Sequence, residues 1–296
     1  MGVLSFQEEG RMFPMTKGWI ALDIDGTITL DKYSVPQPVT DYLKDLQKDG
    51  WKIAMATGRP FRFASMALSK FDFPFVFLCQ NGSVAMEMPS RKILFQRYLT
   101  WDAIHLIEQA YEGIDSDFIV YMGVEKGDLC YFRPDRFPAD EWPAIEAWQA
   151  TQKEKWEGLK QFTPELMPSF PLAKCFGTFE RMEKIAKRLK EMNRFQVALM
   201  RNPFDPSGSV VLITDAQASK GLALEEVFRR LGRGTTVIAA GDDENDISLL
   251  QAADIKIAMS HAPDVLQEFA DILAPPTSKM GIIHALQMAI ANGKSK

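Results

Sequence analysis

Short apolar runs alternate with helical patterns over the first part of the chain. Trp19–Leu22, Trp51–Ala56 and Phe75–Cys79 have the length of buried strands, and each is followed by polar residues. Helical segments separate them, one from Pro36 to Gly50 and one that begins after Pro60. Strands that alternate with helices predict a parallel sheet covered on both faces, and such sheets bind ligands beyond the carboxyl ends of their strands.

The alternation stops at about residue 86 and resumes at about residue 206. The intervening stretch is rich in proline and contains four of the six tryptophans. Beyond it, Val210–Ile213, Thr235–Ala240 and Ile255–Met259 read as strands separated by helices. We therefore predict an α/β fold with a doubly wound, Rossmann-like parallel-sheet core. Its expected parts are an irregular N-terminal extension at 1–14, the core at 15–85 and 206–296, and an inserted domain at 86–205.

Composition and charge narrow the classes of partner. Hydrophobic residues make up 46% and charged residues 25% of the chain, as in ordinary globular proteins. The formal net charge is −5 and no long Lys/Arg run is present, so nucleic acid is not an expected partner. Three cysteines without CxxC spacing favour a reducing compartment over a disulfide framework. We expect a cytoplasmic monomer or homodimer with no signal peptide and no membrane span.

Two carboxylates and a glycine directly follow the first strand, in Asp23-Ile24-Asp25-Gly26-Thr27. A carboxylate attacks phosphorus when a divalent cation offsets the repulsion between the two anions, and a second acid nearby protonates the leaving oxygen. Gly26 lets the backbone approach a phosphate closely. An isolated motif of this kind is as often an ordinary Asx loop, so it needs support from the rest of the chain.

Two further segments offer groups that bind phosphate. Thr57-Gly58-Arg59 ends the second strand, where a hydroxyl and free amides at a helix start hold phosphate oxygens. The alternative is that Thr57 only caps the helix that begins near Pro60. Lys220 is a candidate cationic clamp on a phosphoryl group, although a lysine in a first helical turn is usually just solvated.

The densest acidic cluster is Gly241-Asp242-Asp243-Glu244-Asn245-Asp246, after another buried strand. Hard oxygen ligands of this kind suit magnesium, which retains several waters and needs only a few carboxylates. A capping box is the alternative interpretation, and it accounts for one or two of the acids but not for all of them.

In this order the four segments resemble the motifs of the haloacid dehalogenase superfamily: DxDGT, a Thr or Ser at a strand end, a Lys, and GDxxxD. The resemblance is closest to the Cof-like phosphatases, in which Thr-Gly-Arg, Asn-Gly (here Asn81-Gly82), Ser-Lys-Gly and Gly-Asp-x-x-Asn-Asp recur. It covers about residues 19–85 and 207–290. It implies a magnesium-dependent phosphatase that acts on a small phosphorylated metabolite, and a mixed α/β cap as the inserted domain.

The resemblance also implies a role for each matching residue. Asp23 would be nucleophile and metal ligand, and Asp25 the general acid/base with its backbone carbonyl on Mg²⁺. Asp242 and Asp246 would complete the metal shell. The expected phosphate- and substrate-binding residues are Gly26, Thr57, Gly58, Arg59, Asn81, Lys220 and Asn245.

Some features stay open at this level. A phosphomutase or phosphotransferase would use the same aspartate, and a non-catalytic metabolite-binding protein would typically lack one of the acids, all of which are present here. The family's usual Gly-Asn-Ala is replaced by Ser260-His261-Ala262. The three histidines are too scattered for a zinc motif, and we expect them at the surface or in packing. Specificity is expected to reside in the inserted domain, whose residues do not reveal the substrate.

Overall fold

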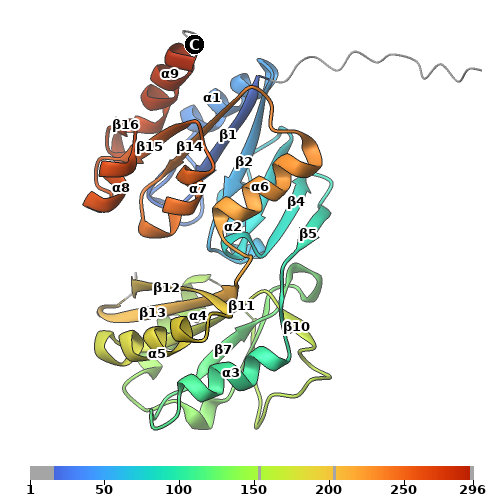
Figure 1. Cartoon of the computed structure of the whole chain (residues 1–296), viewed down its shortest axis with the longest axis vertical. Coiled ribbons are helices and arrows are strands. Elements are labelled where there is room, and N and C mark those ends of the chain that lie inside the picture. Colours follow the sequence, from blue (N-terminus) through green and yellow to red (C-terminus); the bar gives the residue numbers. More distant parts are fainter. Residues whose placement is uncertain (1–16, 153–154, 203–204, 294–296) are drawn as a thin grey trace, which may run out of the picture.

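The computed structural model describes residues 17–152, 155–202 and 205–293 and consists of two lobes that face each other (Figure 1). We call the lobe that contains the first strand the core and the other lobe the cap. The N-terminal extension predicted at 1–14 lies outside the described residues. Within the described ranges no helix is long and apolar enough to cross a membrane.

The core is built on one eight-stranded sheet whose central strand is β1 (Gly18–Asp23). On one side of β1 follow β14 (Thr236–Gly241), β15 (Ile255–Met259) and β16 (Ile272–Ala274), all parallel to it. On the other side lie the parallel strands β2 (Trp51–Ala56) and β3 (Phe75–Cys79) and the antiparallel strands β4 (Val84–Met88) and β5 (Lys92–Gln96).

Helices cover both faces of this sheet, so all six residues of β1 are buried. Residues of α1 (Gln37–Lys48), α2 (Phe61–Ala67) and α9 (Gly281–Gly293) pack in one apolar cluster with one face of the sheet. Residues of α6 (Lys220–Leu231), α7 (Ile247–Gln251) and α8 (Asp264–Phe269) pack with the other face. The predicted doubly wound core is confirmed, and the carboxyl ends of β1, β2 and β14 meet at its edge toward the cap (Figure 1).

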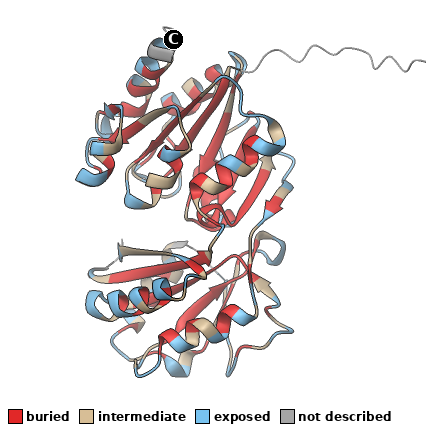
Figure 2. Ribbon diagram, in the orientation of Figure 1, coloured by how far each residue is buried: buried red, intermediate tan, exposed pale blue. Residues whose placement is uncertain are grey.

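The cap contains a six-stranded sheet in the order β12 (Phe195–Asn202), β13 (Asp205–Asp215), β11 (Leu172–Thr178), β7 (Phe118–Tyr121), β8 (Leu129–Phe132) and β9 (Lys155–Gly158). Helices α3 (Asp102–Ala110) and α5 (Phe179–Glu191) pack on one face. Part of the other face packs against α4 (Trp142–Gln152). Strands β6 (Leu99–Thr100) and β10 (Ser169–Phe170) form a separate pair. Buried residues line both sheets (Figure 2).

The changes of sheet do not coincide with the borders predicted at 85/86 and 205/206. The core sheet continues through β5 to Gln96, and β13 belongs to the cap sheet as far as Asp215. The alternation of strands and helices ends near residue 86 because β4 and β5 form an antiparallel hairpin, which needs no crossover helix. The strand expected at Val210–Ile213 forms, but it pairs with β11 and β12 instead of the core, since a buried apolar run does not indicate its sheet.

Candidate functional site

Asp23 is the last residue of β1 and lies at the carboxyl edge of the core sheet, 4% exposed. The chain then turns sharply through Gly26, which has a φ of 74°. A Cβ at this position would lie 1.9 Å from Asp242 Oδ2, so only glycine fits beside the acidic loop. Thr27 donates a hydrogen bond from Oγ1 to Asp242 Oδ1 over 3.1 Å. The predicted DxDGT loop is therefore fastened directly to the predicted acidic cluster.

Lys220 occupies the centre of the site and is not the solvated lysine of the alternative interpretation. It opens α6, whose N-cap is Ser219, and it is only 1% exposed. Its Nζ lies 2.6 Å from Asp23 Oδ1 and 2.6 Å from Asp246 Oδ1. A third hydrogen bond, 3.5 Å long, reaches Asn245 Oδ1. One ammonium group thus joins the end of β1 to the loop after β14.

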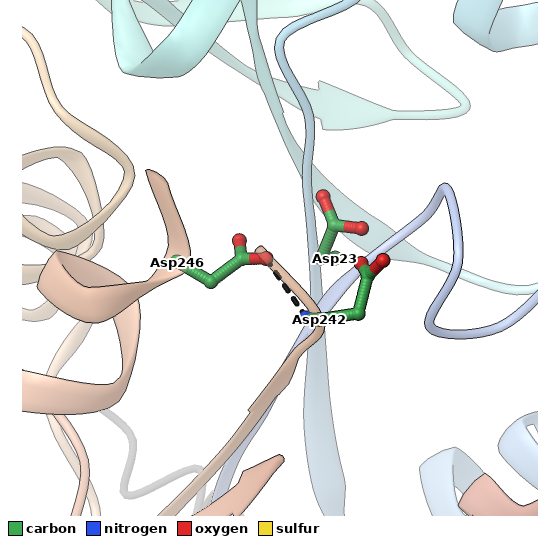
Figure 3. Close-up of side chains that lie close together, drawn as sticks. All are labelled: Asp23, Asp242 and Asp246. Carbon is green, nitrogen blue, oxygen red and sulfur yellow. Dashed lines mark hydrogen bonds between the residues drawn. The ribbon is translucent and has the colours of Figure 1, made fainter. Parts of the chain in front are cut away.

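The acidic loop combines a cap and a carboxylate cluster. Asp243 and Asp246 form a capping box around the 3₁₀ turn η4 (Glu244–Asp246), as the alternative interpretation proposed. Asp246 Oδ2 accepts hydrogen bonds from the backbone amides of Asp242 (3.0 Å) and Asp243 (3.1 Å). The side chain of Asp242 is not part of this capping box and lies beside that of Asp23 (Figure 3). Carboxylate oxygens of Asp23, Asp242 and Asp246 lie within 4.8 Å of one another.

The electrostatics of this cluster favour a further cation. Burial raises the pKa of Asp23 well above its ordinary value, against the lowering effect of Lys220, and the carboxylates of Asp246 and Asp242 raise it further. Burial and the nearby Asp246 raise the pKa of Asp242 to about 7. Burial alone would lower the pKa of Lys220, but Asp23 and Asp246 raise it. Three close carboxylates that share one ammonium therefore fit the hard, oxygen-rich donor set of a divalent cation.

Asp25 stands beside the cluster and is held by Arg59. Its side chain is 54% exposed, whereas the guanidinium is buried. Arg59 Nε donates to Asp25 Oδ2 over 2.6 Å and Nη2 donates to Asp25 Oδ1. Arg59 Nη1 donates to the carbonyl of Lys32, and the guanidinium lies 4.3 Å from the ring centroid of Phe63. The sequence predicted that Arg59 binds phosphate or substrate; in the structure its side chain binds the Asp25 carboxylate, and a contact with substrate stays a prediction.

The remaining predicted residues lie along the cleft wall. Thr57 Oγ1 accepts a hydrogen bond from the amide of Arg59 over 3.1 Å, so it stabilises the turn and does not cap α2. Gly58 and Asn81 line the same cleft. Asn81 adopts φ 56° in the 3₁₀ turn η1 (Gln80–Gly82), and its buried Oδ1 has no hydrogen-bond partner among the described residues. Its side chain is thus available for a ligand.

These residues open into a cleft of about 1710 Å³ that lies between core and cap. The core contributes the carboxylates, Lys220 and the turns after β1 and β2. The cap contributes side chains of β11, β12, β13 and α4. The predicted site residues of the core are therefore gathered at one edge, with the cap opposite them.

Comparison with known proteins agrees with this arrangement. The family model for haloacid dehalogenase-like hydrolases matches residues 20–286. The chain belongs to the haloacid dehalogenase-like hydrolases. Among its relatives, the phosphoglycolate phosphatase of Archaeoglobus fulgidus is 27% identical over 269 residues, which are 90% of this chain and 95% of the relative. The 5-amino-6-(5-phospho-D-ribitylamino)uracil phosphatase YitU of Bacillus subtilis is 21% identical over 90% of this chain and 96% of its own length.

Solved structures show the same fold. A haloacid dehalogenase-like hydrolase from B. subtilis superposes with a TM-score of 0.73 at 20% identity, over 91% of this chain and 99% of that one. The match includes the cap as well as the core, because it extends over nearly the whole of both chains. The predicted membership of the haloacid dehalogenase phosphatases is thereby confirmed, and so is the enzyme class, a hydrolase.

Some neighbours of this hydrolase site were not predicted. His261 is exposed at the surface, as expected of the histidines, and its Nε2 lies 3.5 Å from Asp242 Oδ2. Its signal in the sequence was the departure from Gly-Asn-Ala. Thr277 donates to the backbone carbonyl of Gly26 from a loop in which no motif was recognised. Asp128, in the cap, accepts from the amide of Arg62 at the start of α2, a contact between lobes that no local pattern indicates.

Proposed function

We propose that this hydrolase is a magnesium-dependent phosphomonoesterase that cleaves a small phosphorylated metabolite through a phospho-aspartate on Asp23. The observation that carries the proposal is the position of Asp23: a buried carboxylate at the cleft, 2.6 Å from Lys220 and within 4.8 Å of the oxygens of two further aspartates. A structural ion pair needs one carboxylate for one ammonium. The excess of acids is what a metal-assisted nucleophile requires.

Asp23, Asp242 and the backbone carbonyl of Asp25 are the residues that we propose hold magnesium. The ion, when bound, would neutralise the carboxylates and stabilise charge on the phosphoryl oxygens. Both oxygens of Asp246 already accept hydrogen bonds, from Lys220 and from two backbone amides. Asp246 therefore joins the metal shell only where one of these bonds opens. Otherwise it orients Lys220 and the loop that carries Asp242.

The protein groups then act in two half-reactions, the formation of the phospho-aspartate and its hydrolysis. Lys220, Thr57, Gly58 and Asn81 hold the phosphoryl oxygens while a carboxylate oxygen of Asp23 bonds to phosphorus and the ester oxygen departs. Asp25 gives its proton to that oxygen, so the alcohol leaves neutral. Asp25 then takes a proton from a water molecule, whose oxygen attacks phosphorus and releases phosphate and the Asp23 carboxylate. The site thus returns to its starting state.

A substrate of metabolite size is supported by the relatives and by the cleft. Both curated relatives named above are phosphatases of small phosphorylated molecules by name, one of phosphoglycolate and one of a ribitylaminouracil phosphate. The cleft combines a polar floor in the core with apolar residues such as Met200 and Leu212 in the cap. This is the usual make-up of a small-molecule site.

Substitution of the nucleophile tests the function. We expect Asp23→Asn to abolish the magnesium-dependent release of phosphate from para-nitrophenyl phosphate, because an amide cannot attack phosphorus. The variant should still unfold cooperatively, because the amide has the same shape as the carboxylate. Asp41→Asn, at an exposed position of α1, is the matched control and should keep wild-type turnover. Near-normal turnover by Asp23→Asn, or full wild-type activity in excess chelator, would overturn the proposal. Release of para-nitrophenol that requires an added acceptor alcohol, with the phosphoryl group recovered on that alcohol, would indicate a phosphotransferase.

A further inference from the structure

The longest sheet edge among the described strands lies at the cleft. Of the four strands that border the two large sheets, β12 has eight residues, whereas β5, β9 and β16 have five, four and three. β12 pairs with β13 on one side, and no other described strand pairs with it on the opposite side. Its outer N–H and C=O groups therefore have no ladder partner within the described part of the chain.

Side chains from both faces of β12 line the cleft. Ala198 and Met200 pack with the apolar cluster of α4, whereas Val197 and Leu199 pack with the cluster of α3 and α5. All four residues are half-buried and line the cleft. A cleft that touches both faces of an edge strand also runs along its edge, and β12 lies on the side of the cap that faces the core (Figure 1). The free main-chain groups thus border the same space as Asp23.

Between Phe195 and Met200, β12 has none of the features that usually shield a sheet edge. Proteins protect such edges with prolines, charged residues, bulges or short strands, because an unpaired edge otherwise pairs with another chain. β12 has no proline, and its one charged residue, Arg201, stands at the end of the strand beside a register shift. Lys92 in β5 and Lys155 in β9 belong to shorter edges. An unshielded edge that borders a ligand site is suited to hydrogen bonding with the ligand.

We propose that the leaving group of the substrate carries a planar amide or imide edge, as in a pyrimidinedione ring, which hydrogen-bonds to the main chain of β12 while the ester phosphate lies at Asp23. This inference rests on the proposed phosphatase function and specifies its substrate class. The N–H and C=O groups of one strand residue point to the same side, so a rigid group with a donor beside an acceptor matches them. The half-buried apolar side chains of β12 pack against the ring.

Esters that differ only in the ring test the inference. Riboflavin 5′-phosphate carries an imide, its N3-methyl derivative has the same ring with the imide donor blocked, and ribitol 5-phosphate lacks the ring. Uridine 5′-phosphate and its N3-methyl derivative repeat the comparison on a smaller scaffold. With magnesium and the full chain, kcat/KM should be higher by about tenfold or more for the unmethylated ester in at least one scaffold, because methylation leaves main-chain groups unpaired. Ribitol 5-phosphate should react no faster than the methylated riboflavin ester.

Proline substitutions at neighbouring positions of β12 test the strand edge. The N–H groups of consecutive residues point to opposite sides, so of Val197 and Ala198 one donates to β13 and the other points outward. Proline at the outward position removes the free donor and blocks the approach of a planar group, so that variant should fold and retain a preference of about twofold at most. Proline at the inward position breaks a hydrogen bond to β13 and should lower the free energy of unfolding, which identifies the two positions.

Matched variants control for the side chains. Val197→Ala and Ala198→Ser leave the main chain unchanged and should keep the wild-type preference. If neither proline variant folds, NMR decides: the outward amide proton of β12 should shift when the Asp23→Asn variant binds the preferred ester, and an unchanged β12 spectrum refutes the pairing.

The outcomes separate this inference from the proposed function. A wild-type enzyme that hydrolyses methylated and unmethylated esters equally well refutes the main-chain pairing and leaves the phosphatase function intact. A preference that survives the outward proline assigns recognition of the ring to another element and refutes the role of β12. Absence of magnesium-dependent hydrolysis of any ester overturns the proposed function, and this inference with it.

Discussion

Arg59 holds Asp25 through two hydrogen bonds to its two carboxylate oxygens, and this pairing bears on the acid step. Such a fork holds the carboxylate in one orientation. To protonate a leaving oxygen, Asp25 must release at least one of these bonds when substrate enters. Asp25 is half exposed, whereas Arg59 is buried and also bound to Lys32, so Asp25 is the partner free to move.

We expect Asp25→Asn to impair esters with poor leaving groups most. An alkoxide leaves slowly without a proton donor, whereas a nitrophenolate leaves without one. The loss in kcat/KM should therefore be about 10²–10⁴-fold for alkyl phosphates and clearly smaller for para-nitrophenyl phosphate. The measurement is kcat/KM against leaving-group pKa for both proteins. Equal losses across the series would contradict the acid role and leave Asp25 as a metal or positioning residue.

At the scale of elements, α2 shows how the two lobes depend on each other. Its N-cap is Pro60, which makes no side-chain cap hydrogen bond. The cap lobe supplies one instead, because Asp128 Oδ2 accepts from the amide of Arg62 over 2.5 Å. Asp128 is itself buried, and its Oδ1 has no hydrogen-bond partner among the described residues. A carboxylate from the cap thus stabilises a core helix that starts beside the phosphate-binding turn.

This contact makes stability depend on pH. Burial raises the pKa of Asp128 to about 6, above its ordinary value of 3.8, despite the lowering effect of hydrogen bonds from the backbone. The folded protein therefore binds more protons than the unfolded chain between about pH 4 and pH 6. Asp128 contributes its full stability below that window, and the contribution is lost as the pH rises through it.

Asp128→Asn should remove this dependence. Relative to the variant, the wild type should lose free energy of unfolding between pH 4 and pH 6.5, by about 3 kcal/mol at most. Urea unfolding at pH 4.5, 5.5 and 6.5 measures the difference, with the exposed Asp115→Asn as control. If the free energies of unfolding of wild type and Asp128→Asn change with pH in parallel over this range, Asp128 has the same pKa in the folded protein as in the unfolded chain.

The sequence predicted site residues best where a polar residue directly follows a buried strand. Asp23, Thr57 and Asp242 were predicted at strand ends, and the sheet brings them together because parallel strands end at the same edge. The hairpin β4–β5 and the membership of β13 in the cap sheet were not predicted, because an apolar run indicates a strand but not the strands with which it pairs. Asp128 and His261 were missed for a related reason. Their roles depend on which distant loop or strand faces them, and neither spacing nor residue type records that.

The whole molecule consists of two lobes, and the positions at which the chain passes between them indicate where the cap can be excised. The chain enters the cap after Gln96, the last residue of β5, and leaves it after Asp215, the last residue of β13. The two connections lie side by side, because Arg97 Nη1 donates to the carbonyl of Gln217. A short linker can therefore replace residues 98–216 without stretching the core. Both apolar clusters of the core sheet would keep nearly all of their buried members.

We expect the core with residues 98–216 replaced by a glycine linker to fold, bind magnesium and hydrolyse para-nitrophenyl phosphate slowly, but to lose discrimination among metabolites, because the cap wall of the cleft is gone. Excision of the originally predicted segment, 86–205, is the matched comparison. It removes part of β4 and all of β5 and leaves most of β13 without its partners β11 and β12, so that protein should aggregate or fail to unfold cooperatively. Specificity constants over one ester panel, measured for the full chain and the folded core, decide the point. A folded core that keeps the full chain's substrate ranking would place specificity in the core loops and would exclude the cap from substrate selection.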